Sequence, residues 1–438
     1  MASTRLQRIS SMVAGSTTKA TVSAWVKRSG IGTDGDVYFI RSDNSNYGRI
    51  RIRSDDRIEF IVVLSNSTLI NKRSNRLLRD CSGWYHIVLA IDLTLSTEED
   101  KIKLYINNER ITSWLSNTNT SATSGDWVGG DGNWNPNIGG GYGVGAFFDG
   151  SMSFVSFVDG QALTPSTFGE TDSDTGQWKI KTDIVPGGTG WGTNGYLILK
   201  NGNSLTDEST NTNNFQVVAG GTLTNTLDCP DNVFATFLPF IPRNVGSGDR
   251  NPTFSNGNTT ASFNNSSSNI NAVGSISLKG KYYWETKWIS ANSDGSATTG
   301  IVDLSSYDNG FIGTQCVGYE DDGNKINEGT ATSYGSTYAS GNIIGTAFDS
   351  TTGTIWFSKD GVWQNSATIS EIASGTTTNS AYTGLSTSID WLPLATNYQS
   401  RVCNVNFGNG FFGTTAVTSA GTAGSTPGTF EYDVPSGY

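Results

Sequence analysis

The feature that most limits how this chain can fold is the alternation of apolar and polar residues, broken at short intervals by turn residues. The clearest case is IIGTAFDSTTGTIWFSKDGVWQ, residues 343–364, where Asp360-Gly361 joins two runs of β-forming residues. An Asp-Gly pair in this setting predicts a tight hairpin turn, because both central residues of such a turn need a positive φ. The same plan occurs earlier, in WYHIVLAIDLTLSTEEDKIKLYINNERI, residues 84–111. We therefore expect strands and hairpins in both halves of the chain.

The composition agrees with a β-rich fold. Helical apolar spacing is weak throughout, whereas alternating runs recur. Hydrophobic residues make up 35% and charged residues 15%, and the chain holds 53 Gly, 20 Phe, 16 Tyr and 12 Trp. This composition provides aromatic cores and many turns, and it lacks the charge of a disordered chain. We expect an all-β protein, and the length of 438 residues predicts at least two domains.

The spacing of strands and turns divides the chain into five parts. Residues 1–20 are expected to form an arm, and the closely spaced strands of residues 21–180 predict an antiparallel β-sandwich. Residues 181–270 are less regular and include the Ser/Asn-rich SNGNTTASFNNSSSN, which predicts an extended connector and linker. A second sandwich is expected over residues 271–415, and a Gly/Ser/Thr-rich tail over residues 416–438.

Cysteine and histidine usage disfavours a transition-metal site. Cys81, Cys229, Cys316 and Cys403 are scattered and form no CxxC pair, and His86 is the single histidine. A disulfide between Cys316 and Cys403 is one alternative. We expect reduced, buried thiols instead, because nothing else indicates an oxidising compartment.

Membrane insertion is not expected. No apolar stretch approaches the ~20 residues that a membrane helix needs. Residues 1–18 also lack the continuous apolar segment of an ordinary secretory signal.

Positive charge is concentrated near the N-terminus. Residues 1–110 hold 17 Lys and Arg against 12 Asp and Glu, although the whole chain has a net charge of −11. Arg49, Arg51 and Arg53 alternate with isoleucines, which predicts three guanidinium groups on one face of a strand. Such a row is either a solvated strand face or a docking face for an acidic partner. A nucleic-acid partner is disfavoured, because an acidic protein is repelled by a polyanion.

Each half of the chain resembles a known family. SAWVKR, GWYHIVLAID, KIKLYINNERI, IGGG and FFDGSMSFVSFVDGQALT stand in the order of a laminin-G-like, concanavalin A-like jelly roll. GKYYWETKW, VGYEDDGNKI, residues 333–364 and VNFGNGFF resemble a SPRY domain. Together with QALTPSTFGETDSDTGQWK and GTNGYLILKNGNSLTDEST, they make the chain similar to two-module virion proteins of tailed phages and marine viruses. The resemblance implies two unrelated β-sandwiches in tandem.

Catalysis is not expected. Concanavalin A-like folds include glucanases, which need two carboxylates on one strand face. The local acidic cluster is GETDSDTG, with Glu170, Asp172 and Asp174, and it lacks the Glu-x-Asp-x-x-Glu pattern of laminarinase-type enzymes. Its Gly, Ser and Thr neighbours favour a loop. We expect no cofactor, with calcium binding by Asp172 and Asp174 as a weak alternative.

A glycine-rich loop, GDWVGGDGNWNPNIGGGYGVG over residues 125–145, is the candidate glycan-binding site. An aromatic ring covers the apolar face of a sugar, while amides and carboxylates take its hydroxyl groups. The alternative is that these aromatics cap the end of the sandwich core. The candidate residues are Trp127, Asp131, Asn133, Trp134, Asn135 and Tyr142.

The function implied by the resemblance is a non-catalytic virion structural protein, assembled in the host cytoplasm and displayed on the particle surface. A capsid decoration or knob is favoured, because the sequence shows no stalk of heptads or β-helix repeats; a tail-fibre or receptor-binding tip is the alternative. The expected partners are capsid or tail proteins, docked through Arg5, Arg8, Arg49, Arg51 and Arg53, and host-surface glycans. A secreted lectin or glucanase-like enzyme is the alternative from another class.

Overall fold

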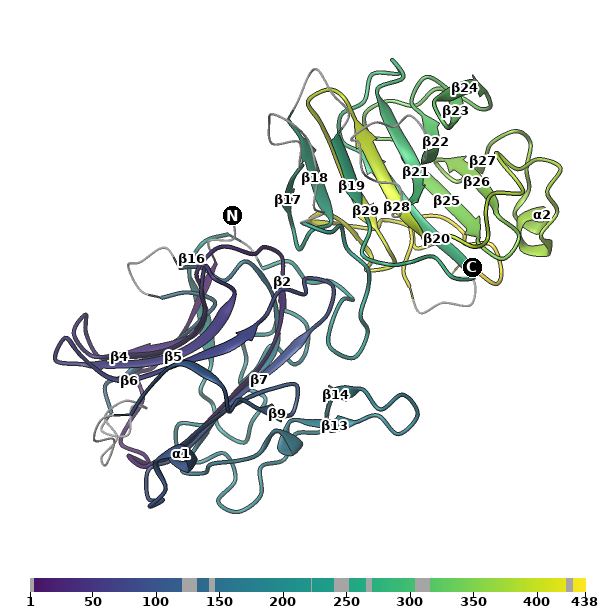
Figure 1. Ribbon diagram of the computed structural model, residues 1–438. Coiled ribbons are helices and arrows are strands. Elements are labelled where there is room, and N and C mark those ends of the chain that lie inside the picture. The colour runs from purple at the N-terminus through teal and green to yellow at the C-terminus, as the bar shows by residue number, and fades with distance from the viewer. Residues whose placement is uncertain are drawn as a thin grey trace. The chain divides into compact units, whose positions relative to one another are not determined.

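The computed structural model describes residues 4–119, 132–141, 146–221, 223–239, 252–264, 270–303, 316–422 and 428–438 (Figure 1). The chain forms two compact units, Met1–Asn225 with Cys229–Val233, and Thr226–Asp228 with Phe234–Tyr438. Both are built from antiparallel strands, so the all-β prediction of tandem sandwiches is confirmed. The α-helices of the described ranges are short, α1 (Glu98–Lys101) and α2 (Ile369–Ser374). None of the described helices has the length and apolar character to cross a membrane.

The first unit consists of two large sheets and a hairpin. Its strands are β1 (Arg5–Arg8), β2 (Lys19–Arg28), β3 (Gly35–Arg41), β4 (Tyr47–Ile52), β5 (Arg57–Leu64), β6 (Ser67–Leu77), β7 (Tyr85–Asp92), β8 (Ile102–Ile106), β9 (Glu109–Arg110), β10 (Trp114–Asn119), β11 (Asn135–Ile138), β12 (Gly150–Asp159), β13 (Gly169–Thr171), β14 (Trp178–Ile180), β15 (Tyr196–Ile198) and β16 (Phe215–Ala219). The eight-stranded sheet has the order β10-β6-β5-β4-β3-β11-β1-β16. The six-stranded sheet has the order β15-β12-β2-β7-β8-β9, and β13 pairs with β14.

The core of the first unit lies between the two large sheets. Alternate residues of each strand point inward, as a pleated strand requires. Ile50 and Ile52 of β4 are buried in this core together with Leu89 and Ile91 of β7. The predicted alternation of arginine and isoleucine is therefore confirmed for β4.

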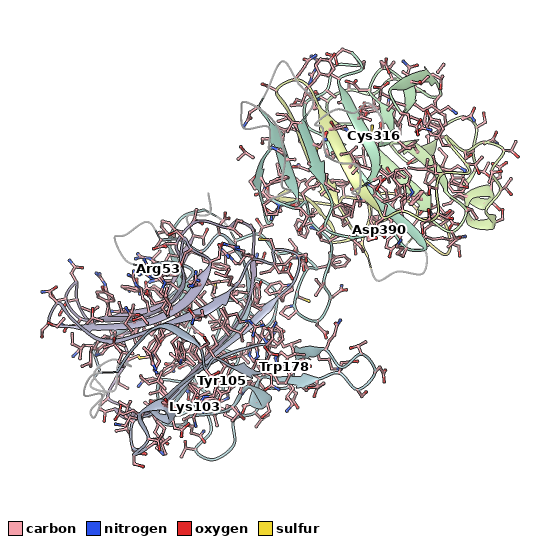
Figure 2. The ribbon with its side chains drawn as sticks, in the orientation of Figure 1. Arg53, Lys103, Tyr105, Trp178, Cys316 and Asp390 are labelled. Atoms are coloured by element: carbon pink, nitrogen blue, oxygen red, sulfur yellow. The ribbon has the colours of Figure 1, made fainter. Side chains whose placement is uncertain are left out.

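The outer face of the six-stranded sheet is covered by the chain that follows β12. Phe168, Ile180 and Trp191 from this segment pack on Trp25 and Val88 of the sheet. The β13–β14 hairpin belongs to this cover (Figure 1), and Trp178 lies where the hairpin meets the sheet (Figure 2). This face of the sheet is thus closed by apolar packing.

His86 is buried within this cover. Its ring stacks on Trp25 at 4.5 Å, and burial lowers its pKa to about 3. The Trp178 Nε1–H donates to Nδ1 at 3.0 Å, so Nδ1 is unprotonated and Nε2–H donates to Ser23 Oγ at 2.9 Å. The single histidine is therefore a neutral structural residue that fastens the hairpin to the sheet.

The prediction of an N-terminal arm and an extended connector is wrong in part. β1, from the expected arm, lies inside the eight-stranded sheet, with Leu6 paired to Ile138 on one side and Val217 on the other. β15 and β16, from the expected connector, complete the two sheets of the first unit. β1 was missed because it has a single apolar residue, Leu6, which gives no visible alternation.

The second unit also contains two large antiparallel sheets. Its strands are β17 (Thr253–Ser255), β18 (Thr260–Phe263), β19 (Ile270–Val273), β20 (Lys281–Trp288), β21 (Ala297–Asp303), β22 (Cys316–Glu320), β23 (Asn324–Asn327), β24 (Thr330–Ser333), β25 (Ile343–Asp349), β26 (Thr354–Lys359), β27 (Val362–Trp363), β28 (Trp391–Asn397), β29 (Arg401–Asn406), β30 (Phe411–Phe412) and β31 (Thr415–Ala416). The orders are β17-β18-β29-β20-β25-β26-β27 and β19-β28-β21-β22-β23-β24, and β30 pairs with β31.

The Asp-Gly hairpin is confirmed. Lys359 pairs with Val362, so Asp360 and Gly361 form a two-residue turn between β26 and β27. Their φ values are 48° and 80°, the positive values that such a turn needs.

The disulfide considered as an alternative to the expected reduced thiols is not formed. Cys316 and Cys403 are free, buried thiols on strands of different sheets. Burial raises the pKa of Cys316 to about 12, which keeps this thiol protonated and unreactive.

The prediction of a C-terminal tail also needs correction, because the last residues of the chain pack into the second unit. Phe430, Val434 and Tyr438 are buried against Trp356 of β26. The composition of residues 416–438 hid these three apolar anchors among Gly, Ser and Thr.

Glu285 of β20 fastens this C-terminal segment. Its buried carboxylate accepts the backbone N–H groups of Glu431 and Tyr432, both at 2.9 Å. Tyr283 Oη and Asn406 Nδ2 donate to it as well, at 3.1 and 3.3 Å. Burial nevertheless raises the pKa of Glu285 to about 7.

Replacing Glu285 tests this anchor. Glu285→Ala leaves four donors without their acceptor, so we expect the free energy of unfolding of the second unit to fall by about 3 kcal/mol. Glu285→Gln keeps the size of the side chain and one acceptor oxygen, so it should lower the free energy of unfolding less than Glu285→Ala does. Both values are measured by denaturant unfolding of the full chain. An alanine variant as stable as the wild type would contradict the anchoring role.

The raised pKa adds a pH signature. Glu285 binds its proton more tightly in the folded state, so its contribution is complete below pH 4.5 and is lost as the pH rises to about 7. The wild type should lose up to about 3 kcal/mol relative to Glu285→Gln across this window. A difference between the two proteins that does not change with pH would contradict the raised pKa.

Candidate ligand-binding face of the first unit

The outer face of the eight-stranded sheet carries polar and aromatic side chains in register. Asn135 of β11 is paired with Arg41 of β3, which is paired with Tyr47 of β4. Directly paired residues of antiparallel strands point to the same side of a sheet. The core residues Ile40 and Ile50 point the other way, so this row faces outward. Asn135, Arg41 and Tyr47 are each half-buried.

A second row supports the first. Phe39 of β3 is paired with Asn137 of β11 and with Arg49 of β4. The Tyr47 ring stacks on Phe39, with centroids 5.8 Å apart and planes at 19°. The Arg49 guanidinium lies 5.5 Å from the centroid of Tyr47. Tyr47 is therefore an aromatic surface held in place by a buried ring and a cation.

The loops at this end of the sheet are tied together by polar contacts. Ser65, after β5, donates its N–H to Asn46 Oδ1 at 2.9 Å, and Asn46 Nδ2 donates to Asp43 Oδ2 at 2.8 Å. Ser11 Oγ donates to Asn135 Oδ1 at 3.0 Å. These bonds order the polar surroundings of Tyr47.

Charged residues form a third row across four strands. Asp36 is paired with Arg51, Arg51 with Glu59, and Glu59 with Arg73. Arg51 Nε lies 2.6 Å from Glu59 Oε2, and Arg53 Nη1 lies 3.2 Å from Glu59 Oε1. The charges alternate in sign, so each strand stabilises the next.

Asp36 is the exception in this row. It is completely buried, neither oxygen accepts a hydrogen bond, and Arg49 Nη1 lies 3.9 Å away. Gly141 packs so closely that a Cβ there would lie 2.6 Å from Asp36 Oδ2. Burial raises the pKa of Asp36 to about 6, and this effect outweighs the attraction of Arg49 and Arg51.

The structure locates half of the predicted glycan-binding residues. Trp127, Asp131 and Tyr142 lie outside the described residues. Asn133 is exposed with a φ of 61°, and Asn135 joins the outward row.

Trp134, in contrast, is 2% exposed and belongs to the core of the sandwich. For this residue the alternative interpretation, a ring that completes the core, fits the structure. Its indole face is not available to a ligand.

The predicted docking arginines need a correction. Arg5, Arg8 and Arg51 are buried, and Arg53 is ion-paired with Glu59. Arg8 Nη1 donates to Asn194 Oδ1 at 3.3 Å, inside the same unit. These side chains hold the sheet together, so they do not form one exposed basic docking face.

The carboxylate of Asp172 in the β13–β14 hairpin is bound by groups of the same hairpin. Asp172 Oδ1 accepts the N–H groups of Asp174 and Thr175 at 3.0 and 2.9 Å, and Lys179 Nζ lies 3.0 Å from Oδ2. These bonds hold the pKa of Asp172 far below its usual range. In the described ranges, no group of three or more His, Cys, Asp and Glu residues is arranged to hold a metal ion. The weak calcium alternative gains no support at Asp172 and Asp174.

Three site residues were not predicted from the sequence, namely Phe39, Arg41 and Tyr47. A signal existed, because Tyr47 has the same parity as Arg49 and Arg51 in YGRIRI and so lies on the same strand face. The contribution of Phe39 and Arg41 depends on the register between β3 and β4, which the sequence does not state.

Comparison with known proteins supports the fold of the first unit. Residues 5–167 match a family described as the concanavalin A-like lectin/glucanases superfamily. This match supports the predicted concanavalin A-like fold for the first half of the chain. No curated protein was found to match the chain.

Solved structures with similarity to the chain include lectin-like and SPRY proteins. The SPRY domain of human HERC1 is 16% identical over 34% of this chain and 87% of that chain, with a TM-score of 0.27. A SAP-like pentraxin from Limulus polyphemus is 17% identical over 37% and 71%, with a TM-score of 0.26. A Bacteroides ovatus protein described as a candidate carbohydrate-binding protein is 16% identical over 53% and 62%, with a TM-score of 0.34. At these low values, the three proteins say nothing about what this chain binds.

Asp36→Asn tests the unpaired carboxyl group. Because the folded pKa of about 6 exceeds the ordinary 3.8, ionised Asp36 destabilises the fold as the pH rises through this window. We expect the variant to gain up to about 3 kcal/mol in free energy of unfolding, relative to the wild type, between pH 3.8 and pH 7.5. Denaturant unfolding at several pH values measures this gain. Asp183→Asn, at an exposed position, is the control, and an equal change there would contradict the role of Asp36.

Proposed function

We propose that this chain is a non-catalytic carbohydrate-binding protein displayed on the surface of a tailed-phage particle. It binds host-surface glycans through the outer face of the eight-stranded sheet. The observation that carries the proposal is the outward row of Asn135, Arg41 and Tyr47 in a concanavalin A-like lectin domain.

The chemistry of this row suits a sugar. A saccharide presents C–H groups on one side of its ring and hydroxyl groups around its edge, so it needs a flat apolar surface with hydrogen-bonding groups beside it. Tyr47 offers the ring, and Arg41 and Asn135 offer donors and acceptors in the same row. Stacking on Phe39 fixes the ring before a ligand arrives, which reduces the ordering cost of binding.

The carboxyl groups of this face argue for binding without hydrolysis. A glycosidase needs two carboxylates that reach the substrate. Asp36 and Glu59 of the charged row are buried. Asp34 and Asp55 beside the row are engaged by ion pairs with Arg51 and Arg73. Glu59 is also held by Arg51 and Arg53. The half-buried Asp172 of the β13–β14 hairpin is held by the N–H groups of its own turn and by Lys179.

Placement on a virion rests on the resemblance of both halves to two-module phage virion proteins. Within this proposal we favour a capsid decoration or knob, and a tail-fibre tip is the alternative. The structure removes Arg5, Arg8 and Arg51 from the attachment surface, because they are buried.

Tyr47→Ala tests glycan binding. Loss of the ring should weaken the affinity of the full chain for its glycans about tenfold, which equals roughly 1.4 kcal/mol. Candidate glycans are found on a glycan array and their affinities measured by calorimetry.

Tyr398→Ala is the matched control, since Tyr398 is a 37% exposed tyrosine of the second unit. It should leave the affinity unchanged. A wild-type chain that binds no glycan, or equal affinities for wild type and Tyr47→Ala, would contradict the proposal.

The location on the particle is a separate prediction. Cryo-electron microscopy of the virus that encodes this chain should show density for two tandem β-sandwiches on the capsid lattice. Density at the tail instead would make the chain a receptor-binding component. Purified particles that lack the chain altogether would favour a secreted lectin and contradict the virion role.

A further inference from the structure

Arg49 differs from the other arginines predicted to share its strand face. Arg51 has two close carboxylates, Glu59 at 2.6 Å and Asp34 at 3.1 Å, and Arg53 has Glu59 at 3.2 Å. The carboxylate nearest to Arg49 is Asp36, at 3.9 Å and without hydrogen-bond geometry. The charge of Arg49 is therefore the least compensated of the three.

Arg49 also occupies the centre of the candidate site. Its guanidinium lies over Tyr47, and its backbone pairs with Phe39 in the supporting row. The side chain is 15% exposed, and the buried Nε–H has no hydrogen-bond acceptor. A partly buried cation with an unused donor and an open side favours an anionic ligand group.

The charge of the surrounding face also favours an anionic ligand. Although the chain has a net charge of −11, six arginines and five carboxyl groups gather on or beside this face. They are Arg41, Arg49, Arg51, Arg53, Arg57 and Arg73, with Asp34, Asp36, Asp43, Asp55 and Glu59. The face is thus locally cationic on an acidic protein, which concentrates anionic ligands there.

We propose that the glycan bound by this face is an acidic polysaccharide whose carboxylate or sulfate group binds Arg49 beside the Tyr47 ring. The inference rests on the proposed function, because it names the class of sugar for the same site. A planar guanidinium donates two parallel hydrogen bonds to either group, and partial burial strengthens them. The sugar ring that carries the anion then lies against Tyr47.

Asp36 makes this binding depend on pH. It faces Arg49 and Arg51 of β4, Asp34 before β3, and Glu59 of β5. When ionised, it competes with the ligand anion for Arg49. Its pKa of about 6 means that the competition ends as the pH falls from 7.5 to 5.5. The affinity for acidic polysaccharide should rise severalfold over this interval.

The test uses the full chain and three probes at 0.15 M salt: alginate for carboxylates, dextran sulfate for sulfate esters, and unmodified dextran as the neutral polymer. Arg49→Gln should lower the affinity for the preferred acidic probe at least tenfold. Arg49→Lys, which keeps the charge without the fork, should show an intermediate loss. Arg110→Gln is the control, because Arg110 lies on the other sheet, where it is paired with Asp100 at 2.9 Å. The affinity of this variant for the acidic probe should differ from that of the wild type by less than twofold.

Asp36→Asn gives an independent readout that a loss of folding cannot imitate. This variant should bind the acidic probe severalfold more tightly than the wild type at pH 7.5, and its affinity should no longer change between pH 7.5 and 5.5. A decrease in affinity, or an unchanged pH dependence, would overturn the inference.

The outcomes separate this inference from the proposed function. Preference for alginate or for dextran sulfate identifies the anionic group. Binding of neutral glycans alone, with sensitivity to Tyr47→Ala, overturns the acidic ligand and leaves the lectin function standing. Absence of binding to every glycan overturns both. If wild type and Arg49→Gln bind both acidic probes with equal affinity, Arg49 does not bind the ligand anion. If the wild type binds duplex DNA as tightly as the acidic probes, the face selects negative charge and not an acidic sugar.

Discussion

The pleat of the antiparallel strand is the constraint on which the rest of this structure depends. Each strand residue must face either the core or the outside, so one register fixes two surfaces at once. On β4, the same alternation that buries Ile50 and Ile52 places Tyr47, Arg49 and Arg51 outward. A slip of one residue would exchange these sets. The apolar core therefore determines which side chains stand on the outer face that forms the candidate site.

The two sheets of the first unit use their outer faces differently. The six-stranded sheet closes its face with apolar side chains such as Phe168 and Trp191, around a neutral His86. The eight-stranded sheet carries polar residues there and compensates most charges between neighbouring strands. Compensation is incomplete where Asp36 and Arg49 meet. Imperfect pairing of this kind is common where a protein keeps groups ready for a ligand.

Local sequence patterns were sufficient to predict the fold class. They could not predict ion pairs and burial that depend on contacts between residues far apart in the sequence. Asp360-Gly361 predicted its hairpin because both φ values are a property of the turn itself. Arg49, Arg51 and Arg53 were assigned to one face, but their carboxylate partners belong to other strands, so their pairing required the register. For the same reason, the sequence left open whether Trp134 is buried, since its backbone C=O accepts a hydrogen bond from the N–H of the distant Met12.

The position of β1 has a consequence for how the first unit is made. Leu6 is paired with Ile138 and with Val217, so β1 has no partner strand until most of the unit has been synthesised. Contacts of such long sequence separation form slowly. Until β11 emerges, β1 has no sheet to join, and its unpaired backbone groups can pair with other nascent chains. The yield of folded protein should therefore depend on the speed of translation and on chaperones more than the stability of the finished sandwich suggests.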